Sequence, residues 1–276
     1  MKLSPFSPGC GVVVTKVQLA DMTDSEVADL RTVFNQHGLV LFRDQLLSPE
    51  EHLSFANQFG EIVINKFFPP LEGFPNIALV IKEKDQNTNI GGGWHTDHSY
   101  DEVPAMGSIL VARNLPTSGG DTHFANMYSA YEALSPGLQQ TLETLSAVHS
   151  NKHLYGKDGY YSTTDLGSVL TGHDSVSDAV HPLVIRHPDS GRKVLYVNPG
   201  HTIGIVGWSI EESKVLLDYL YTHASQAQFI CQFNWLPGSV AIWDNRSTWH
   251  YAQNDYQGQA RLLHRITLEG APLLAA

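Results

Sequence analysis

Cysteine and basic residues are scarce in this chain, and each scarcity argues against a class of protein. Cys10 and Cys231 are the only cysteines, too few for a disulfide framework and without the paired spacing of a zinc or iron–sulfur motif. We therefore expect two free thiols. Lys and Arg total 17 against 28 acidic residues, a formal net charge of −11. Such a charge disfavours binding to nucleic acid or to anionic lipid.

Long hydrophobic runs are also missing. No segment approaches the ~20 apolar residues of a membrane span, and Pro and Gly interrupt the N-terminus, where a signal peptide needs an unbroken apolar stretch. No repeat, low-complexity tract or long linker divides the chain. The sequence therefore predicts a soluble cytoplasmic protein that forms one domain over residues 1–276, with no membrane partner.

The chain does contain many short apolar runs, each bounded by Gly, Pro, Asn or Asp. The predicted strands cover 12–17, 39–42, 77–82, 105–112, 145–149, 182–186, 193–198, 228–235, 239–243 and 261–268. Short strands at turn-bounded intervals are typical of a sandwich or barrel. The sequence therefore favours a mainly β fold.

Helices are predicted at four places. One runs from a cap at Thr23 or Asp24 to Gly38, and one starts at Ser48-Pro49-Glu50-Glu51 and stops near Gly60. The others cover about 126–143 and a segment that starts with the capping box at Ser209. The stretch 150–180 has no clear period and is long for a connection, so we expect a lid or substrate loop there.

Two distant blocks contain the residues that a metal centre needs. Residues 94–97 read Trp-His-Thr-Asp, and a later block closes on His250. His95, Asp97 and His250 can supply two imidazoles and one carboxylate to one metal, the ligand set of non-haem Fe(II) oxygenases. On an extended strand His95 and Asp97 would point to one face. A lone His-x-Asp pair is equally compatible with a turn histidine beside a solvated aspartate.

Three blocks together resemble the taurine dioxygenase family of Fe(II)- and 2-oxoglutarate-dependent oxygenases. They are Trp-His-Thr-Asp at 94–97, Gly-Gly-Asp-Thr at 119–122, and Trp-Asp-Asn-Arg-Ser-Thr-Trp-His at 243–250 followed by Arg-Leu-Leu-His-Arg at 261–265. The resemblance extends from about residue 10 to residue 270. It implies a double-stranded β-helix, a cupin-like jelly-roll with flanking helices, and a requirement for Fe(II), 2-oxoglutarate and O2.

The resemblance also implies roles for individual residues. By the family's pattern the iron ligands are His95, Asp97 and His250. Arg261 and Thr122 would bind the distal carboxylate of 2-oxoglutarate, and a planar two-pronged guanidinium suits a carboxylate. Arg265 would face the substrate, whereas His264 would point away. Taken alone, Arg261 is also compatible with a surface ion pair and Thr122 with a turn hydroxyl.

The reaction implied is conversion of 2-oxoglutarate to succinate and CO2, coupled to hydroxylation of a small organic substrate, with or without later bond cleavage. Asp97 is retained, whereas related halogenating enzymes have a small residue at that position. An inward-pointing Arg265 near a metal cation needs an anion beside it, which favours an anionic substrate. Family members often associate into dimers or tetramers, so a homo-oligomer is a further expectation.

Two departures from the family's pattern concern the substrate. Gly91-Gly92-Gly93 replaces the expected asparagine region, and the loop 65–70 lacks the expected substrate histidine. Taurine itself is therefore disfavoured. Residues that could line the pocket are Phe67, His98, Tyr100, Asp101 and the histidines and tyrosines of 153–161. Aromatic residues in a β-rich chain lie in the core more often than in a pocket.

Two other functions fit parts of the sequence. A non-catalytic jelly-roll binding protein would keep the fold, but it needs neither the iron triad nor the anchor for a keto acid. A zinc-dependent hydrolase could use the same triad with an activated water, but it leaves Arg261 unexplained and lacks an evident general base. The dioxygenase hypothesis explains the triad together with Thr122 and Arg261.

Overall fold

The computed structural model describes all residues from 1 to 276. Its strands are β1 (Lys2–Pro5), β2 (Val12–Thr15), β3 (Leu39–Phe42), β4 (Ile62–Val63), β5 (Pro70–Leu71), β6 (Phe74–Lys82), β7 (Gly107–Asn114), β8 (Thr122–Asn126), β9 (Ser146–Ser150), β10 (Asp178–Pro182), β11 (Val184–Arg186), β12 (Lys193–Leu195), β13 (Thr202–Ile205), β14 (Ile230–Phe233), β15 (Val240–Asp244), β16 (Thr248–Ala252), β17 (Arg261–Leu268) and β18 (Leu274–Ala275). Its helices are α1 (Asp24–His37), α2 (Pro49–Phe59), α3 (Met127–Glu132), α4 (Pro136–Leu142), α5 (Lys152–Tyr155) and α6 (Ile210–Ala224), with 3-10 turns η1 (Leu19–Asp21), η2 (Tyr160–Thr163) and η3 (Ala227–Phe229).

The predicted helix starts are confirmed by their caps. Thr23, Ser48 and Ser209 each accept a hydrogen bond from the backbone N–H three residues later, and the glutamate at that position bonds back to the cap. Gly38 ends α1 with φ 70°, a conformation that glycine adopts at little cost. Local sequence chemistry therefore sets these boundaries.

The segment predicted as one helix over 126–143 is two short helices. Asn126 caps α3, which ends at Glu132, and Ser135 then caps α4 with Pro136 in its first turn. A proline has no N–H to donate and starts a helix more readily than it continues one. The apolar spacing across the break led to the wrong prediction.

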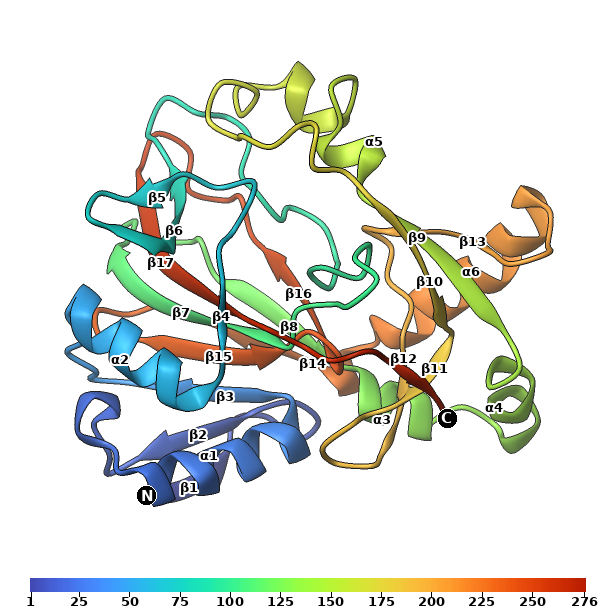
Figure 1. Ribbon diagram of the computed structural model, residues 1–276, viewed down its shortest axis with the longest axis horizontal. Helices are drawn as coiled ribbons and strands as arrows, with labels where there is room; N and C mark the ends of the chain where they lie inside the picture. The colour runs from blue at the N-terminus through green and yellow to red at the C-terminus, as the bar shows by residue number, and fades with distance from the viewer.

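The strands form one large sheet and three small ones (Figure 1). The nine-stranded sheet has the order β1-β2-β3-β15-β7-β17-β6-β5, with β4 paired to β17. One small sheet, β14-β8-β16, packs against the inner face of the large sheet. The other two, β10-β9-β13 and β12-β11-β18, lie beside α3 and α6. The predicted double-stranded β-helix with flanking helices is confirmed.

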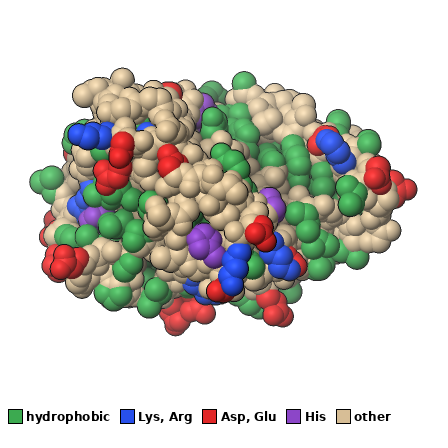
Figure 2. Space-filling view, turned by 90° about the horizontal axis from the view of Figure 1, so that it is seen from above, with side chains coloured by type: hydrophobic (Ala, Val, Ile, Leu, Met, Phe, Trp, Pro, Cys, Tyr) green, Lys and Arg blue, Asp and Glu red, His purple; other side chains and the backbone are tan.

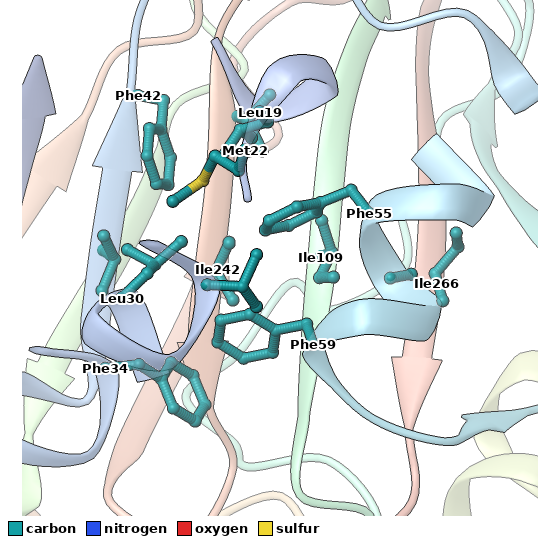
Figure 3. Close-up of a cluster of buried hydrophobic side chains, with 14 of the residues drawn as sticks. Leu19, Met22, Leu30, Phe34, Phe42, Phe55, Phe59, Ile109, Ile242 and Ile266 are labelled. Carbon is teal, nitrogen blue, oxygen red and sulfur yellow. The ribbon is translucent and has the colours of Figure 1, made fainter. Parts of the chain in front are cut away.

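Alternation along the central strands separates two cores. Leu39 and Leu41 of β3 face the small sheet, where they pack with Phe124 and Phe233. The intervening Val40 and the next residue, Phe42, face α1 and α2 on the opposite side. This outer core includes the side chains drawn in Figure 3, among them Leu30, Phe34, Phe55, Phe59, Ile109, Ile242 and Ile266. Both faces of the large sheet are therefore covered, as in a layered β fold.

Two strands that carry site residues were not predicted from the sequence. β8 and β16 are adjacent in the small sheet, with His250 opposite Phe124 in the register. Their sequences, Thr-His-Phe-Ala-Asn and Thr-Trp-His-Tyr-Ala, contain too many polar residues for the apolar pattern of a strand. Backbone pairing with each other and with β14 makes them strands, and Thr122, His250 and Ala252 on these strands line the site.

Three further observations bear on expectations from the sequence. Cys10 and Cys231 are free thiols and are buried. The structure contains no helix with the length and apolar character that crossing a membrane requires. Figure 2, which views the molecule from the side of α5, shows acidic and basic side chains interspersed rather than gathered into a basic patch.

Candidate active site

The three predicted metal ligands meet at one point between the large sheet and the small sheet. One donor atom from each of His95, Asp97 and His250 lies within 4.8 Å of the others. The Nε2 atoms of His95 and His250 lie 3.6 and 3.5 Å from the two carboxylate oxygens of Asp97. Two imidazoles and a carboxylate therefore converge, as the sequence predicted.

Backbone hydrogen bonds place His95 against His250. The N–H of His95 donates to the carbonyl of His250 at 3.1 Å, and the N–H of His250 donates back at 2.8 Å. His95 forms only this isolated bridge, and Asp97 starts a turn. The two residues thus lie in a loop, not on the extended strand considered from the sequence, and the bridge to β16 orients them.

Gly91 is required where this loop passes the triad. Its φ is 76°, and a Cβ on it would lie 3.1 Å from Cε1 of His95. A larger residue would be strained by its backbone and would press on the imidazole. The glycines that depart from the family's pattern therefore shape the space beside a predicted ligand.

The imidazole nitrogens are disposed for metal binding. Nδ1 of His95 lies 2.8 Å from the carbonyl of Gly93 and must donate to it, which leaves the lone pair on Nε2. Burial, followed by the proximity of His95, holds the pKa of His250 well below its ordinary value. Neutral imidazoles are the form that binds metals.

Asp97 is held by a cation from β17. The Arg265 guanidinium donates to Oδ2 of Asp97 at 2.6 Å and to the hydroxyl of Ser108 at 2.8 Å. Burial opposes ionisation of Asp97, but Arg265 and the two histidines outweigh it and hold the pKa of this carboxyl well below its ordinary value. Arg265 therefore keeps the carboxylate charged and fixes its orientation.

Thr122 and Arg261 lie in the same inner cavity as the triad. The hydroxyl of Thr122 accepts hydrogen bonds from the Trp235 indole at 2.9 Å and from Arg261 at 3.4 Å, so its own hydrogen is available to a ligand. Arg261 is 5% exposed, and its Nε has no partner. A buried guanidinium with an unpaired N–H is suited to binding an anion.

A second, larger cavity adjoins the first. It has a volume of about 460 Å³ and shares Gly91, His95 and Tyr155 with the inner cavity. Its other lining residues are Asn87, Thr88, Asn89, Gly92, Gly93, Trp94, Leu154, Tyr160, Tyr161, Pro199, Gly200, His201 and Asn254. The outer cavity thus leads from the surface to one ligand of the triad.

His201 was not singled out from the sequence, although its ring is close to the triad. It lies 6.2 Å from the ring of His95, and its Nδ1 bonds to the carbonyl of Ser150 at 3.3 Å. Burial, followed by the proximity of His95, lowers the pKa of His201 to about 3. His201 lies three residues after the end of the predicted strand 193–198, and an isolated histidine gives no sequence signal of its own.

The predicted pocket residues divide into two groups. Tyr155, Tyr160 and Tyr161 line the outer cavity, as considered from the sequence. His153 instead bonds to the carbonyl of Gly200 at 2.9 Å and is not part of the lining.

Phe67, Tyr100, His98 and Asp101 also lie outside both cavities. Phe67 and Tyr100 belong to a buried apolar cluster, and His98 pairs with Asp101 at 2.9 Å. Phe67 and Tyr100 thus take the core position that the sequence also allowed, and pairing takes up the side chains of His98 and Asp101. Across β17, His264 points away from the cavity, as predicted, and accepts a hydrogen bond from Arg113.

The donor set fits Fe(II). Two nitrogens and one carboxylate oxygen lie within 4.8 Å of one another, and all three residues line the inner cavity. Such a set leaves coordination positions for exchangeable ligands, unlike a closed structural zinc site. The unpaired Arg261 Nε provides a place for an anionic co-ligand a short distance away.

Comparison with known proteins agrees with this geometry. The (S)-phenoxypropionate/alpha-ketoglutarate-dioxygenase of Sphingobium herbicidovorans is 32% identical, over 98% of this chain and 95% of the relative. The alpha-ketoglutarate-dependent sulfate ester dioxygenase of Pseudomonas putida is also 32% identical, over 98% and 90%. A taurine dioxygenase structure from Burkholderia xenovorans matches with a TM-score of 0.83 and 33% identity, over 99% and 92%.

The family described as taurine catabolism dioxygenase TauD, TfdA family, matches residues 2–267. Nearly the whole chain is therefore covered, including every residue of both cavities. The resemblance inferred from three sequence blocks is confirmed. The chain belongs to the TauD/TfdA family and is an alpha-ketoglutarate-dependent dioxygenase, an enzyme that uses Fe(II), 2-oxoglutarate and O2.

Proposed function

We propose that this enzyme hydroxylates a small organic anion, with or without later bond cleavage, while 2-oxoglutarate is converted to succinate and CO2. In this proposal His95, Asp97 and His250 hold Fe(II). Thr122 and Arg261 bind the distal carboxylate of 2-oxoglutarate. The observation that carries the proposal is the presence of all five side chains around one inner cavity.

The residues of the inner cavity have distinct roles in the proposed reaction. Bound Fe(II) supplies the redox chemistry with O2 and the co-substrate. Arg261 and the free hydroxyl hydrogen of Thr122 fix the far end of 2-oxoglutarate, so that its keto-acid end points toward the triad. Arg265 keeps Asp97 ionised and oriented. The walls of Trp243 and Leu110 exclude water from the inner cavity.

An anionic substrate is supported by the distribution of charge around the site. No Lys or Arg lines the outer cavity, and the cations of the inner cavity are Arg261 and Arg265. With Arg261 assigned to 2-oxoglutarate, Arg265 is the other cation of this cavity, and it would contact a substrate anion in addition to its pair with Asp97. The named substrates of two relatives, (S)-phenoxypropionate and sulfate esters, are themselves anions. The tyrosines of the outer cavity would contact the body of the substrate.

The segment 150–180 is proposed as the lid of this site. Tyr155 from α5 borders both cavities, and the segment is fastened to the loop 65–70 by two hydrogen bonds from Thr171 at 3.0 and 3.1 Å. The inner cavity has a volume of only about 40 Å³. Because Tyr155 borders this small cavity and the larger outer one, movement of the lid would change the space open to 2-oxoglutarate and to the substrate.

The alternatives have weaker support. A zinc hydrolase needs a general base beside the activated water, and Asp97 is the only carboxylate that lines either cavity. A non-catalytic binding protein has no use for a convergent triad next to an unpaired Arg261. We also propose that residues 1–276 act as one dioxygenase domain. Cytoplasmic location and assembly into dimers or tetramers stay predictions from the sequence.

A panel assay tests the proposed function. The purified enzyme is incubated with Fe(II), 2-oxoglutarate, O2 and a library of sulfonates, sulfate esters, phenoxyacids, phosphonates and amino acids. We expect succinate release that one class of anion accelerates and that omission of Fe(II) abolishes. If only zinc-loaded protein is active, as a hydrolase without succinate release, the proposal is wrong. Stimulation by a neutral compound alone would reject the anionic substrate while leaving the reaction class intact.

A further inference from the structure

Lys82 occupies a position that neither the family resemblance nor the triad explains. It is the last residue of β6 and pairs with Arg261, the first residue of β17. Residues directly opposite each other in antiparallel strands point to the same face, with Cβ atoms roughly 5 Å apart. In the same register Val80 pairs with Leu263 and Ala78 pairs with Arg265. Lys82 therefore continues the row of β6 that faces the site.

The surroundings of Lys82 leave its charge unpaired. The side chain is 2% exposed, and its Nζ has no hydrogen-bond partner. The ammonium lies 4.7 Å from the centre of the Tyr256 ring, and the residues next to Lys82 on the same face, Val80 and Arg261, line the inner cavity. A cation over an aromatic face is attracted to it, but this attraction does not replace the hydration that burial removes.

Arg261, opposite Lys82 in the register, also has few hydrogen-bond partners. Its Nε is unpaired, and its one hydrogen bond is the long contact with Thr122. Asp121 attracts Arg261 but forms no ion pair with it, and its two oxygens accept hydrogen bonds from Gln232 at 2.7 Å and Asn234 at 2.9 Å. Two buried cations on neighbouring positions, with no carboxylate in contact with either, require an anion from outside the chain.

We propose that Lys82 is a second cation of the 2-oxoglutarate site, which binds the distal carboxylate together with Arg261. The inference rests on the proposed role of the inner cavity. Arg261 supplies a rigid fork, whereas the flexible four-carbon stem of Lys82 carries its ammonium from the Tyr256 ring to the carboxylate when the co-substrate binds. One carboxylate thereby meets two positive charges.

The test is calorimetric binding of N-oxalylglycine, a 2-oxoglutarate analogue, to the Mn(II)-loaded protein, which needs no turnover. Lys82→Met keeps the length of the stem and removes the charge. We expect the dissociation constant to rise roughly 10- to 100-fold, the worth of a hydrogen bond to a charged group. Lys82→Arg should recover most of the affinity. Lys84→Met, an exposed lysine two residues away, is the matched control and should bind like the wild type.

The variant Arg261→Met distinguishes failure of the proposed 2-oxoglutarate site from failure of the role proposed for Lys82. In one outcome the wild type binds N-oxalylglycine, Arg261→Met does not, and folded Lys82→Met binds within twofold of the wild type. Lys82 then has no role in binding, and the proposed function stands. If Arg261→Met also binds like the wild type, or the wild type does not bind at all, the co-substrate site is wrong and Lys82 falls with it. A thermal melt of each variant checks its fold. If Lys82→Met does not fold, Lys82→Gln takes its place.

Discussion

The two cavities are built differently. The inner cavity takes Thr122, His250, Arg261 and Arg265 from the paired strands β8, β16 and β17, and all four residues are buried. The outer cavity takes its lining from loops and short helical turns between residues 87 and 95, 154 and 161, and 199 and 201, and from Asn254. Ladder hydrogen bonds fix the first set, whereas connecting segments can change without disturbing the sheets.

This difference separates reaction from specificity. The residues assigned to Fe(II) and 2-oxoglutarate lie on the rigid side, apart from His95 and Asp97, which the backbone bridge ties to β16. Apart from Arg265, the residues proposed to meet the substrate lie in the connecting segments. A fold of this kind can keep one reaction while accepting different substrates. Substitutions in each cavity can therefore test whether the inner cavity governs the reaction and the outer cavity governs the choice of substrate.

The largest effect is expected at the triad. His95→Ala or Asp97→Ala should lower succinate formation by more than about 100-fold, because even groups that only orient metal ligands are worth 10- to 100-fold. Succinate is measured by mass spectrometry, and circular dichroism checks that the fold is intact. Full activity in either variant would remove that residue from the metal site.

The next effect is expected at the co-substrate anchor. Arg261→Ala should raise the KM for 2-oxoglutarate roughly 30-fold or more, since truncating one partner of a buried charged pair is costly. The KM for the primary substrate should change much less. Arg186→Ala, an exposed arginine of β11, is the control. An unchanged KM in Arg261→Ala would contradict the assignment.

A smaller effect is expected at Arg265, which is proposed both to orient Asp97 and to contact the substrate. Arg265→Met removes the hydrogen bond that orients Asp97, so metal affinity should fall about 10- to 100-fold. Mn(II) binding measured by calorimetry reports this loss without turnover. If affinity for the metal is retained and only the KM for the substrate rises, Arg265 acts on the substrate alone.

The smallest effect is expected in the outer cavity. His201→Phe replaces the polar edge of the imidazole by an apolar ring, and it should change the order of preference within the substrate panel with KM changes of about tenfold. The KM for 2-oxoglutarate should stay within twofold, as it should in His37→Phe, a control at the exposed end of α1. Equal shifts in both KM values would show that the two cavities are not separable.

Much of the fold could be predicted from local sequence chemistry. The caps at Thr23, Ser48 and Ser209 gave three helix starts, and turn-bounded apolar runs gave most strands of the large sheet. Prediction failed where a strand is polar because it faces the site, as in β8 and β16. Apolar periodicity indicates which residues are buried in a core. A strand that lines a functional cavity has polar residues on its buried face, so this periodicity is absent.

The sequence by itself predicted which residues converge at the inner cavity, because motif residues in fixed order are those that a metal and a keto acid need as ligands. Tertiary structure alone decided what surrounds them. It placed His201 next to His95, set Lys82 opposite Arg261, and turned His98 away into a pair with Asp101. Such contacts join residues whose spacing along the chain carries no signal, since strand register and loop packing arise only when the whole chain folds.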